Sequence, residues 1–557
     1  MSSNISRRGF LRLSAVAGTA LLMSCSPAQA PAPTAAPATK APGTQAPAAP
    51  AASAVAATQA PVAASTQAPV AGTPKKGGQI KVGMSGDLAN FEPTIQLQPN
   101  IPILFNLFDT PTQYDKQMKP QPYLATSWQF ASDGLSVTMK IRQGVKFHTG
   151  RELTAEDVNF ALRRAQDPKV GALYKFMADK IVAAEAPDPY TVVWRFQSAN
   201  PGVYDLMSKL HVVDKENIDK TDFTKRGSGT GPFIFSEFVP GNRMLLKRNP
   251  NYWRKDAAGN ALPYLDEVLI TMFPDPQAAV ANLEAGAIDV LTFVPIVDAV
   301  RLRGGSKITV VQGPVRALYD ILMTTAKKPF AEQKVRQAVS NLVNREQYWS
   351  TNFNGVGDWT CIPFPSQSAA YFADLAKSIK PDVEKAKKLL ADAGYADGFE
   401  TSILTSRQVQ KEHLDIAVLY QQDLAKIGIK AKIDDVEAAE YNRRVLAGEL
   451  ETAIHAYARA NYDPDTLFGG AKAWTPTVGF TKFGEPEYVK LINDAASSYN
   501  MEERKPKYRT LIQYVMDQAF TLTVCYNPEL YAYAPYAKGV TTDTDYNTDY
   551  SQAWLDK

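Results

Sequence analysis

Alternating apolar and polar residues mark several short strands along the chain. The segments 79–84 (QIKVGM), 136–142 (SVTMKIR) and 191–196 (TVVWRF) repeat with the period of two that is typical of a half-buried strand. We therefore predict a strand in each segment. Three further strands are predicted at 233–238, 400–404 and 430–433.

Helical patterns alternate with these strands. In 154–164, Thr154 precedes an apolar face of Val158, Ala161 and Leu162, and Asp157 stands three residues after Thr154, as in a capping box. Two further helices are predicted at 382–393, ended by Gly394, and at 414–426, ended by Gly428. Because helices and strands are mixed throughout the chain, the sequence predicts an α/β fold.

The N-terminus has the pattern of an export signal. Arg7 and Arg8 precede an apolar run at 13–23, and Ser24-Cys25 follows it. That run is about half the ~20 residues that a membrane-spanning helix needs. We predict a twin-arginine signal peptide at 1–24 with a lipobox, so that Cys25 carries a lipid. The alternative is a plain secretory signal that is cleaved nearby.

The composition of residues 25–75 predicts a disordered tether. This stretch is rich in Ala, Pro and Thr, Thr-Gln-Ala-Pro recurs at Thr44, Thr58 and Thr66, and no aromatic residue occurs between Phe10 and Phe91. Such a segment buries too little apolar surface to offset the loss of chain entropy on folding.

The remaining body is large enough for two or three domains and has no excess charge. Without Arg7, Arg8 and Arg12, 57 basic residues face 57 acidic ones, so no nucleic-acid partner is expected. No later run of 18 apolar residues occurs. Cys361 and Cys525 either pair or stay as two buried thiols.

No catalytic or metal-binding pattern stands out in the body. The four histidines, His148, His211, His413 and His455, form no close ligand pair, so neither a metal nor a cofactor is expected. The glycine-rich run at 227–231 lacks a following Lys-Ser/Thr and is interpreted as a tight turn. We expect a protein that is not an enzyme, although the sequence alone leaves a glycosidase-type carboxylate pair open.

Six segments spread over the body resemble the extracellular solute-binding proteins of dipeptide and oligopeptide ABC importers. Their order and spacing match as well, and 144–158 and the pair 229–233 with 247–253 are the most specific. The six are NLFDTP from Asn106, LATSWQFASDG from Leu124, IRQGVKFHTGRELTAEDV from Ile141, GTGPF from Gly229 with KRNPNYW from Lys247, KVRQAV from Lys334, and AKKLLADAGY from Ala386.

The resemblance implies a two-lobed, periplasmic-binding-protein-like fold that closes over its ligand about a hinge. Lobe I would comprise 76–114, 227–313 and 527–557, with a subdomain inserted at 115–226, and lobe II would comprise 314–526. The conserved-looking segments are expected to be scaffold, so Trp128, Phe147 and Trp253 are interpreted as core residues rather than ligand contacts.

The resemblance also implies the function and the partners. The chain would be a monomer that captures a peptide or a sugar-like small molecule and delivers it to an ABC permease and its ATPase. Its lipid at Cys25 would hold it at the outer face of the cytoplasmic membrane, or in the periplasm. The alternatives are a binding receptor for oligosaccharides or other non-peptide solutes without a transport role, and an anchored hydrolase.

The segment from Ala456, AYARANYDPDTLF, carries the predicted ligand site. Peptide-binding relatives place an aspartate there for the ligand ammonium, but Ala460 or Asn461 stands at that position in this chain. Arg407 matches a position that binds a ligand carboxylate, or else is a solvated loop charge. We therefore expect peptides with a free amine to bind poorly. The predicted ligand-binding residues are Arg407, Tyr457, Arg459, Asn461, Tyr462 and Asp463.

Overall fold

A computed structural model describes most of the chain beyond residue 71. The described residues are 72–85, 88, 90–95, 101–115, 118–303, 305, 307–458, 463–476, 479–542 and 547–557. All of them belong to one of the two units into which the chain divides, the unit from 61 to 557. The predicted signal peptide, Cys25 and almost all of the predicted tether lie outside the described residues.

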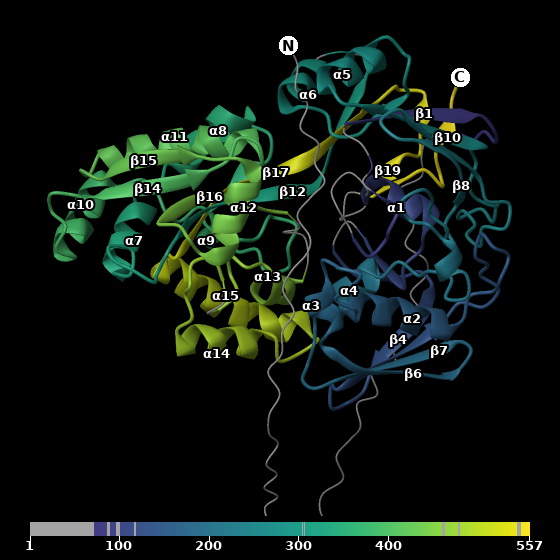
Figure 1. Ribbon diagram of the computed structural model, residues 1–557, viewed down its shortest axis with the longest axis horizontal. Helices are drawn as coiled ribbons and strands as arrows, with labels where there is room; N and C mark the ends of the chain where they lie inside the picture. The colour runs from purple at the N-terminus through teal and green to yellow at the C-terminus, as the bar shows by residue number, and fades with distance from the viewer. Residues whose placement is uncertain are drawn as a thin grey trace, which may run out of the picture. The chain divides into compact units, whose positions relative to one another are not determined.

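An eleven-stranded mixed sheet runs through this unit (Figure 1). Ten strands follow in the order β15-β14-β16-β12-β17-β11-β1-β10-β9-β8, and β13 pairs with β17 beside this path. Their bounds are β1 Gln79–Ser85, β8 Phe233–Val239, β9 Arg243–Arg248, β10 Glu267–Phe273, β11 Val290–Leu291, β12 Thr309–Met323, β13 Asp358–Trp359, β14 Glu400–Thr405, β15 Lys430–Asp435, β16 Thr452–Ala458 and β17 Thr521–Tyr533.

A separate four-stranded sheet, in the order β4-β5-β7-β6, lies within the range predicted as an inserted subdomain, and we keep that name for it and its helices. Its core of Val137, Met139, Val158, Trp194 and neighbours packs the sheet against helices. The elements are β4 Ala125–Phe130, β5 Ser136–Ile141, β6 Ile181–Asp188, β7 Thr191–Phe196, α2 Ala155–Gln166, α3 Lys175–Ala178 and α4 Val203–Lys209.

Helices cover the remaining faces of the main sheet. They are α1 Ile101–Leu107, α5 Pro276–Glu284, α6 Ile296–Leu302, α7 Gln333–Ser340, α8 Arg345–Phe353, α9 Ala373–Ala376, α10 Val383–Asp392, α11 Lys411–Ala425, α12 Ala438–Ala447, α13 Pro464–Gly470, α14 Pro486–Ala495 and α15 Met501–Gln518. The short strands are β2 Thr112–Tyr114, β3 Pro120–Pro122, β18 Ala537–Lys538, β19 Thr541–Thr542, β20 Thr548–Asp549 and β21 Trp554–Leu555.

The predicted elements form close to where the sequence pattern places them. The strands predicted at 79–84, 136–142 and 191–196 are β1, β5 and β7. Asp157 accepts the backbone N–H of Thr154 at 2.9 Å, which confirms the capping box. The helix predicted at 414–426 begins earlier, at Lys411, and ends at Ala425.

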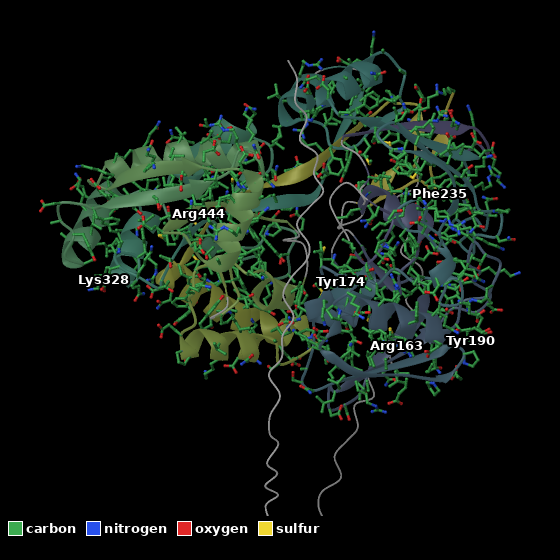
Figure 2. The ribbon with its side chains drawn as sticks, in the orientation of Figure 1. Arg163, Tyr174, Tyr190, Phe235, Lys328 and Arg444 are labelled. Carbon is green, nitrogen blue, oxygen red and sulfur yellow. The ribbon has the colours of Figure 1, made fainter. Side chains whose placement is uncertain are left out.

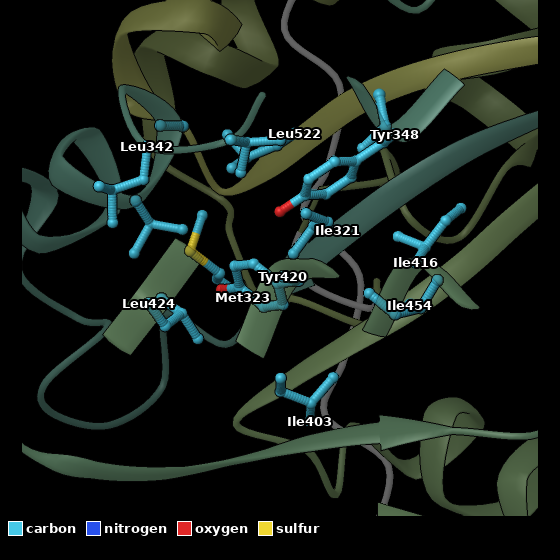
Figure 3. Close-up of a cluster of buried hydrophobic side chains, with 14 of the residues drawn as sticks. Ile321, Met323, Leu342, Tyr348, Ile403, Ile416, Tyr420, Leu424, Ile454 and Leu522 are labelled. Carbon is cyan, nitrogen blue, oxygen red and sulfur yellow. The ribbon is translucent and has the colours of Figure 1, made fainter. Parts of the chain in front are cut away.

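Two hydrophobic cores pack the opposite faces of the β14–β16 part of the main sheet. In one of them, α8 and α11 cover Ile321, Ile403 and Ile454 (Figure 3). Tyr348 of that core donates its hydroxyl to Asp423 at 2.7 Å, so that its polar end is satisfied. The other core gathers Leu322, Leu404 and the aromatic residues that follow α13.

Strands β12 and β17 form a long antiparallel ribbon that connects the two ends of the main sheet. Near its start, β12 pairs with residues 530–533 of β17, and further along it pairs with 521–528. The register shifts between Gln312 and Val315 and again between Val315 and Ala317. The predicted lobe boundaries at 313/314 and 526/527 fall inside these two strands; the boundaries themselves stay a prediction.

Both cysteines of the described body are buried and free. The structure thus favours the second of the two alternatives, unpaired thiols. Among the described residues, every helix is too short or too polar to span a membrane.

Candidate functional site

Two of the predicted ligand-binding residues, Arg407 and Tyr457, lie at one edge of the main sheet. Strands β14, β15 and β16 run parallel, so their carboxyl ends meet at the same edge. In open α/β sheets, ligands bind in the crevice outside the carboxyl ends of such strands. Arg407 follows β14, Asp435 ends β15, and Tyr457 lies near the end of β16.

Arg407 is an exposed side chain that forms an ion pair. Its side chain is 62% accessible, its Nε contacts the carboxylate of Asp435, and its backbone N–H donates to the same carboxylate at 3.0 Å. Partial burial works against ionisation of Asp435, but the hydrogen bonds and charge of Arg407 hold the pKa of Asp435 below its usual value. A ligand carboxylate at Arg407 would therefore share the guanidinium with Asp435 or displace it.

Tyr457 is half-buried on β16, opposite Leu318 of β12. Its ring packs against the core that contains Leu404 and Phe468. One side of the Tyr457 side chain therefore packs against the protein core, as is needed for a ring on which a ligand stacks.

Three of the predicted site residues, Arg459, Asn461 and Tyr462, lie outside the described residues, as does Ala460. Asp463 is described, and it begins α13 as its N-cap, where its side chain accepts the N–H of Asp465 at 2.9 Å. Its carboxylate is also clamped by both terminal nitrogens of Arg504, one of them at 2.8 Å.

The clamp makes Asp463 a structural anchor. Arg504 is 1% exposed, and the side chain of Asp463 is 9% exposed. A buried, bidentate pair of this kind neutralises the carboxylate and uses up its acceptor capacity. The carboxylate of Asp463 is therefore already paired with another group of the protein. Sequence reasoning missed Arg504, because nothing local links it to a residue 41 positions earlier.

Buried polar groups lie beneath the carboxyl edge of the sheet, and the sequence did not single them out as a site. Both ring nitrogens of His413 and the hydroxyls of Thr405 and Ser406 are buried and make no hydrogen bond to any residue that the structure describes. Burial, assisted by the nearby His455, lowers the pKa of His413 to about 3. This imidazole is therefore neutral at physiological pH and can both donate and accept a hydrogen bond.

The family-like segments meet far from this edge, around Asp109. This buried carboxylate accepts the Thr230 hydroxyl at 2.8 Å and the Trp253 indole N–H at 2.9 Å. Burial raises the pKa of Asp109, although these donors oppose the rise. Phe147 is 2% exposed and lies in the core of the inserted subdomain, against which Trp128 and Trp253 also pack, in agreement with their interpretation as scaffold.

No group of three or more His, Cys, Asp or Glu side chains in the described part of the chain could hold a metal ion. The described sheet edge presents the guanidinium of Arg407 and the half-buried ring of Tyr457, and the neutral imidazole of His413 is buried beneath them.

Comparison with protein families gives one match that covers more than half of the chain. Residues 119–477 match the model described as bacterial extracellular solute-binding proteins, family 5 Middle.

Curated relatives are similar over most of their length. Heme-binding protein A of Haemophilus influenzae is 29% identical over 452 residues, which cover 75% of this chain and 81% of that protein. The dipeptide-binding protein of Escherichia coli K12 is 27% identical over 527 residues, or 84% of this chain and 97% of that protein.

Solved structures share the fold. The binding protein AgaA of A. tumefaciens R10 in complex with agropinic acid has a TM-score of 0.71 and 25% identity, over 85% of this chain and 98% of that one. The ABC transporter-associated periplasmic binding protein DppA of Helicobacter pylori with peptide STSA has a TM-score of 0.72 and 25% identity, over 87% and 99%. These matches confirm the predicted α/β binding-protein fold.

Proposed function

The chain belongs to the bacterial extracellular solute-binding proteins of family 5, and we propose that it delivers a small polar solute to an ABC permease and its ATPase. The membership confirms the resemblance in the sequence and makes the chain a solute-binding protein that works outside the cytoplasm. The observation that carries the proposal is the family match over residues 119–477. The relatives named above are binding proteins, and we assign the chain no catalytic step.

We propose further that the preferred solute carries an anionic group and lacks a free ammonium. Relatives that bind dipeptides, heme and agropinic acid show how widely the ligand varies within similar folds. Here Asp463 is paired with Arg504, and Asp465 is paired with Lys180 at 2.9 Å. Neither carboxylate is free for an ammonium group, which would be costly to bury without a partner. Arg407 supplies the positive charge for a ligand carboxylate.

We propose a role in solute binding for each of the predicted ligand-binding residues. Arg407 and Arg459 would bind the anionic group, Tyr457 and Tyr462 would stack on the solute, and Asn461 would supply a neutral hydrogen bond. Asp463 would act indirectly, by holding the start of α13 directly after these residues.

A ligand titration tests this proposal. Protein that has been unfolded and refolded to remove any bound solute is titrated by calorimetry with Ala-Ala and with N-acetyl-Ala-Ala. Losing one charge-assisted hydrogen bond corresponds to about tenfold to a hundredfold in affinity, so the acetylated peptide should bind at least as well as the free one. Nanomolar to low-micromolar binding of Ala-Ala, together with weaker binding of its acetylated form, would contradict the proposal.

We also propose that the protein is a monomer tethered to the outer face of the cytoplasmic membrane by a lipid at Cys25, with 25–75 as spacer. One acyl chain alone binds membranes only marginally, so lasting attachment needs the several chains of a lipoprotein anchor. Cys25→Ser should move the protein from the membrane fraction to the soluble fraction, measured by immunoblot after cell fractionation. Equal membrane retention of wild type and Cys25→Ser would show that no lipid is attached there.

A further inference from the structure

The inserted subdomain contacts α13 just after the predicted ligand-binding residues. Helices α3 and α13 lie side by side (Figure 1), although almost 300 residues separate them in the chain. Figure 2 labels Tyr174, the residue that precedes α3, in this region. We call this contact the α3–α13 junction, formed by residues of β4, α3 and α4 on one side and by α13 and Tyr499 on the other.

Asp205 of α4 is the centre of the junction. Its carboxylate is fully buried, and it accepts the backbone N–H of Asp463 at 3.0 Å and the hydroxyl of Thr466. From its own side it also accepts the hydroxyl of Tyr114 at 2.6 Å. One carboxylate of the subdomain thus holds two groups at the start of α13.

Two ion pairs support the junction. Lys180 binds Asp465 across the contact at 2.9 Å, and Arg504 binds Asp463. Burial and the charge of Asp463 raise the pKa of Asp205 above its usual value, although hydrogen bonds from Thr466 and Tyr114 and the charge of Lys209 oppose the rise. Buried carboxylates are tolerated when they are hydrogen-bonded, as these three are.

Aromatic contacts border the charged centre. The ring of Tyr499 stacks on Phe130 with 3.9 Å between centroids. The Tyr499 hydroxyl donates to the carbonyl of Gly134 at 2.9 Å and accepts the N–H of Asn200 at 3.0 Å. On the other border, Phe176 lies so close to Gly470 that a Cβ there would be 2.1 Å from the ring. The junction is thus closely packed on both borders of its charged centre.

We propose that Asp205 is a positioning residue for solute binding, because it fixes the start of α13 when the subdomain and α13 come together. The inference rests on the proposed function. The contacts join protein groups directly, so they stabilise the closed arrangement without a solute between them. A protein that closes must form them, and a protein that opens must break them, so the junction sets the balance between closed and open states.

Single-molecule energy transfer in the full chain tests this directly. Dyes on Lys169→Cys and Glu487→Cys, both exposed, report the separation of the subdomain from α14. Cys25 is replaced by Ser in every variant, Cys361 and Cys525 are buried, and a chain without the two added cysteines measures any background labelling. The measurement uses refolded protein with no solute added.

Removing the acceptor should shift the balance towards the open state. Asp205→Ala is expected to lower the ratio of closed to open molecules by about tenfold to a hundredfold, the effect of losing a buried, charged hydrogen-bond partner. Thr466→Val removes one donor from the α13 side at almost constant volume, and should lower the ratio by about three- to tenfold. The double variant should fall short of the product of the two effects, because both substitutions remove the same bond.

Matched lysines provide the control. Lys180→Met should lower the closed fraction, because Lys180 pairs with Asp465 across the junction. Lys175→Met should not, because the one ion pair of Lys175 among the described residues is with Asp179 of the same subdomain. Circular dichroism and the thermal midpoint verify that each variant is folded.

The proposal is overturned if wild type has no closed population under these conditions, or if the ratio is the same in wild type and folded Thr466→Val and Lys180→Met proteins. Such a result would leave the proposed function untouched, since solute binding is measured separately by titration. Conversely, a chain that binds none of the tested solutes can still show the shift in closure.

Discussion

Two connections in the molecule differ in kind, one made by backbone and the other mainly by side chains. The β12–β17 ribbon joins the two ends of the main sheet with a ladder of main-chain hydrogen bonds, and the described β17 is buried along nearly all its length. The α3–α13 junction joins the inserted subdomain to α13 and Tyr499 through Asp205, Lys180 and the stacked rings of Phe130 and Tyr499.

We therefore interpret the β12–β17 ribbon as the hinge and the α3–α13 junction as a contact that can break. Opening the ribbon would leave many backbone groups unpaired, which folded proteins avoid. Its register shifts give local freedom to bend without loss of the ladder. The junction involves a few side chains, and water can replace its bonds when the parts separate. We therefore expect ribbon variants to change global stability and junction variants to change mainly closure.

The largest expected effect comes from Arg504, which pairs with Asp463 on the α13 side of the junction. Arg504→Met would leave the buried Asp463 carboxylate without its partner and should reduce the free energy of unfolding by about 3–5 kcal/mol. Urea denaturation measures this change. Arg509→Met on the same helix removes an exposed pair with Asp374 and a cation–π contact with Phe372, and should cost about 1 kcal/mol. Equal losses for the two variants would contradict the structural role of Arg504.

An effect of up to about 3 kcal/mol is expected from pH, through His148 between the subdomain and the 227–231 turn. Its Nδ1 accepts the Gly229 N–H at 3.3 Å, and its Nε2–H donates to the Gly231 carbonyl at 3.0 Å. Burial lowers the pKa of His148 to about 4. The unfolded chain therefore takes up the proton first, and stability is lost as pH falls from about 6.5 towards 4.

Unfolding curves at pH 7 and pH 5 measure this loss in wild type and in His148→Gln. The variant should lose less stability than wild type over the same interval. Some loss should persist in both proteins, because burial also lowers the pKa of His455 to about 4. If wild type and His148→Gln lose the same stability between pH 7 and pH 5, His148 does not contribute to the acid sensitivity.

A smaller effect, about 1–3 kcal/mol, is expected from crowding the ribbon at Gly313. A Cβ on Gly313 would lie 1.6 Å from the hydroxyl oxygen of Tyr531, so the ring must move if Gly313→Ala is to fold. Gly305→Ala is the matched control, because its nearest neighbour would be the Leu302 carbonyl at 3.5 Å. The urea midpoint should fall for Gly313→Ala and stay unchanged for Gly305→Ala. In a chain that already carries Tyr531→Ala, adding Gly313→Ala should no longer lower the midpoint.

Much of the fold followed from local patterns. The alternation in 191–196 gave β7, and Thr154 with Asp157 gave the start of α2, because strand periodicity and helix capping depend on residues only a few positions apart. The order of the family-like segments was enough to indicate the fold class, although the sequence did not show that two of the six, NLFDTP and GTGPF with KRNPNYW, converge on Asp109.

The site was predicted less completely. The sequence placed Arg407 and Tyr457 in one site, and their strands do end at the same sheet edge. It suggested a ligand contact at Asp463, whose partner Arg504 lies 41 residues away, and it gave no sign of the buried His413. A side chain becomes buried or paired only through packing, which local patterns do not encode.

The sequence by itself determined the family and most of the secondary structure, since each depends on short motifs or on their order. Only the tertiary structure decided that Asp205 captures the backbone of Asp463, 258 residues further along the chain. The reason is physical: a hydrogen bond requires two groups about 3 Å apart, and the distance between remote groups is fixed by the packing of every element between them.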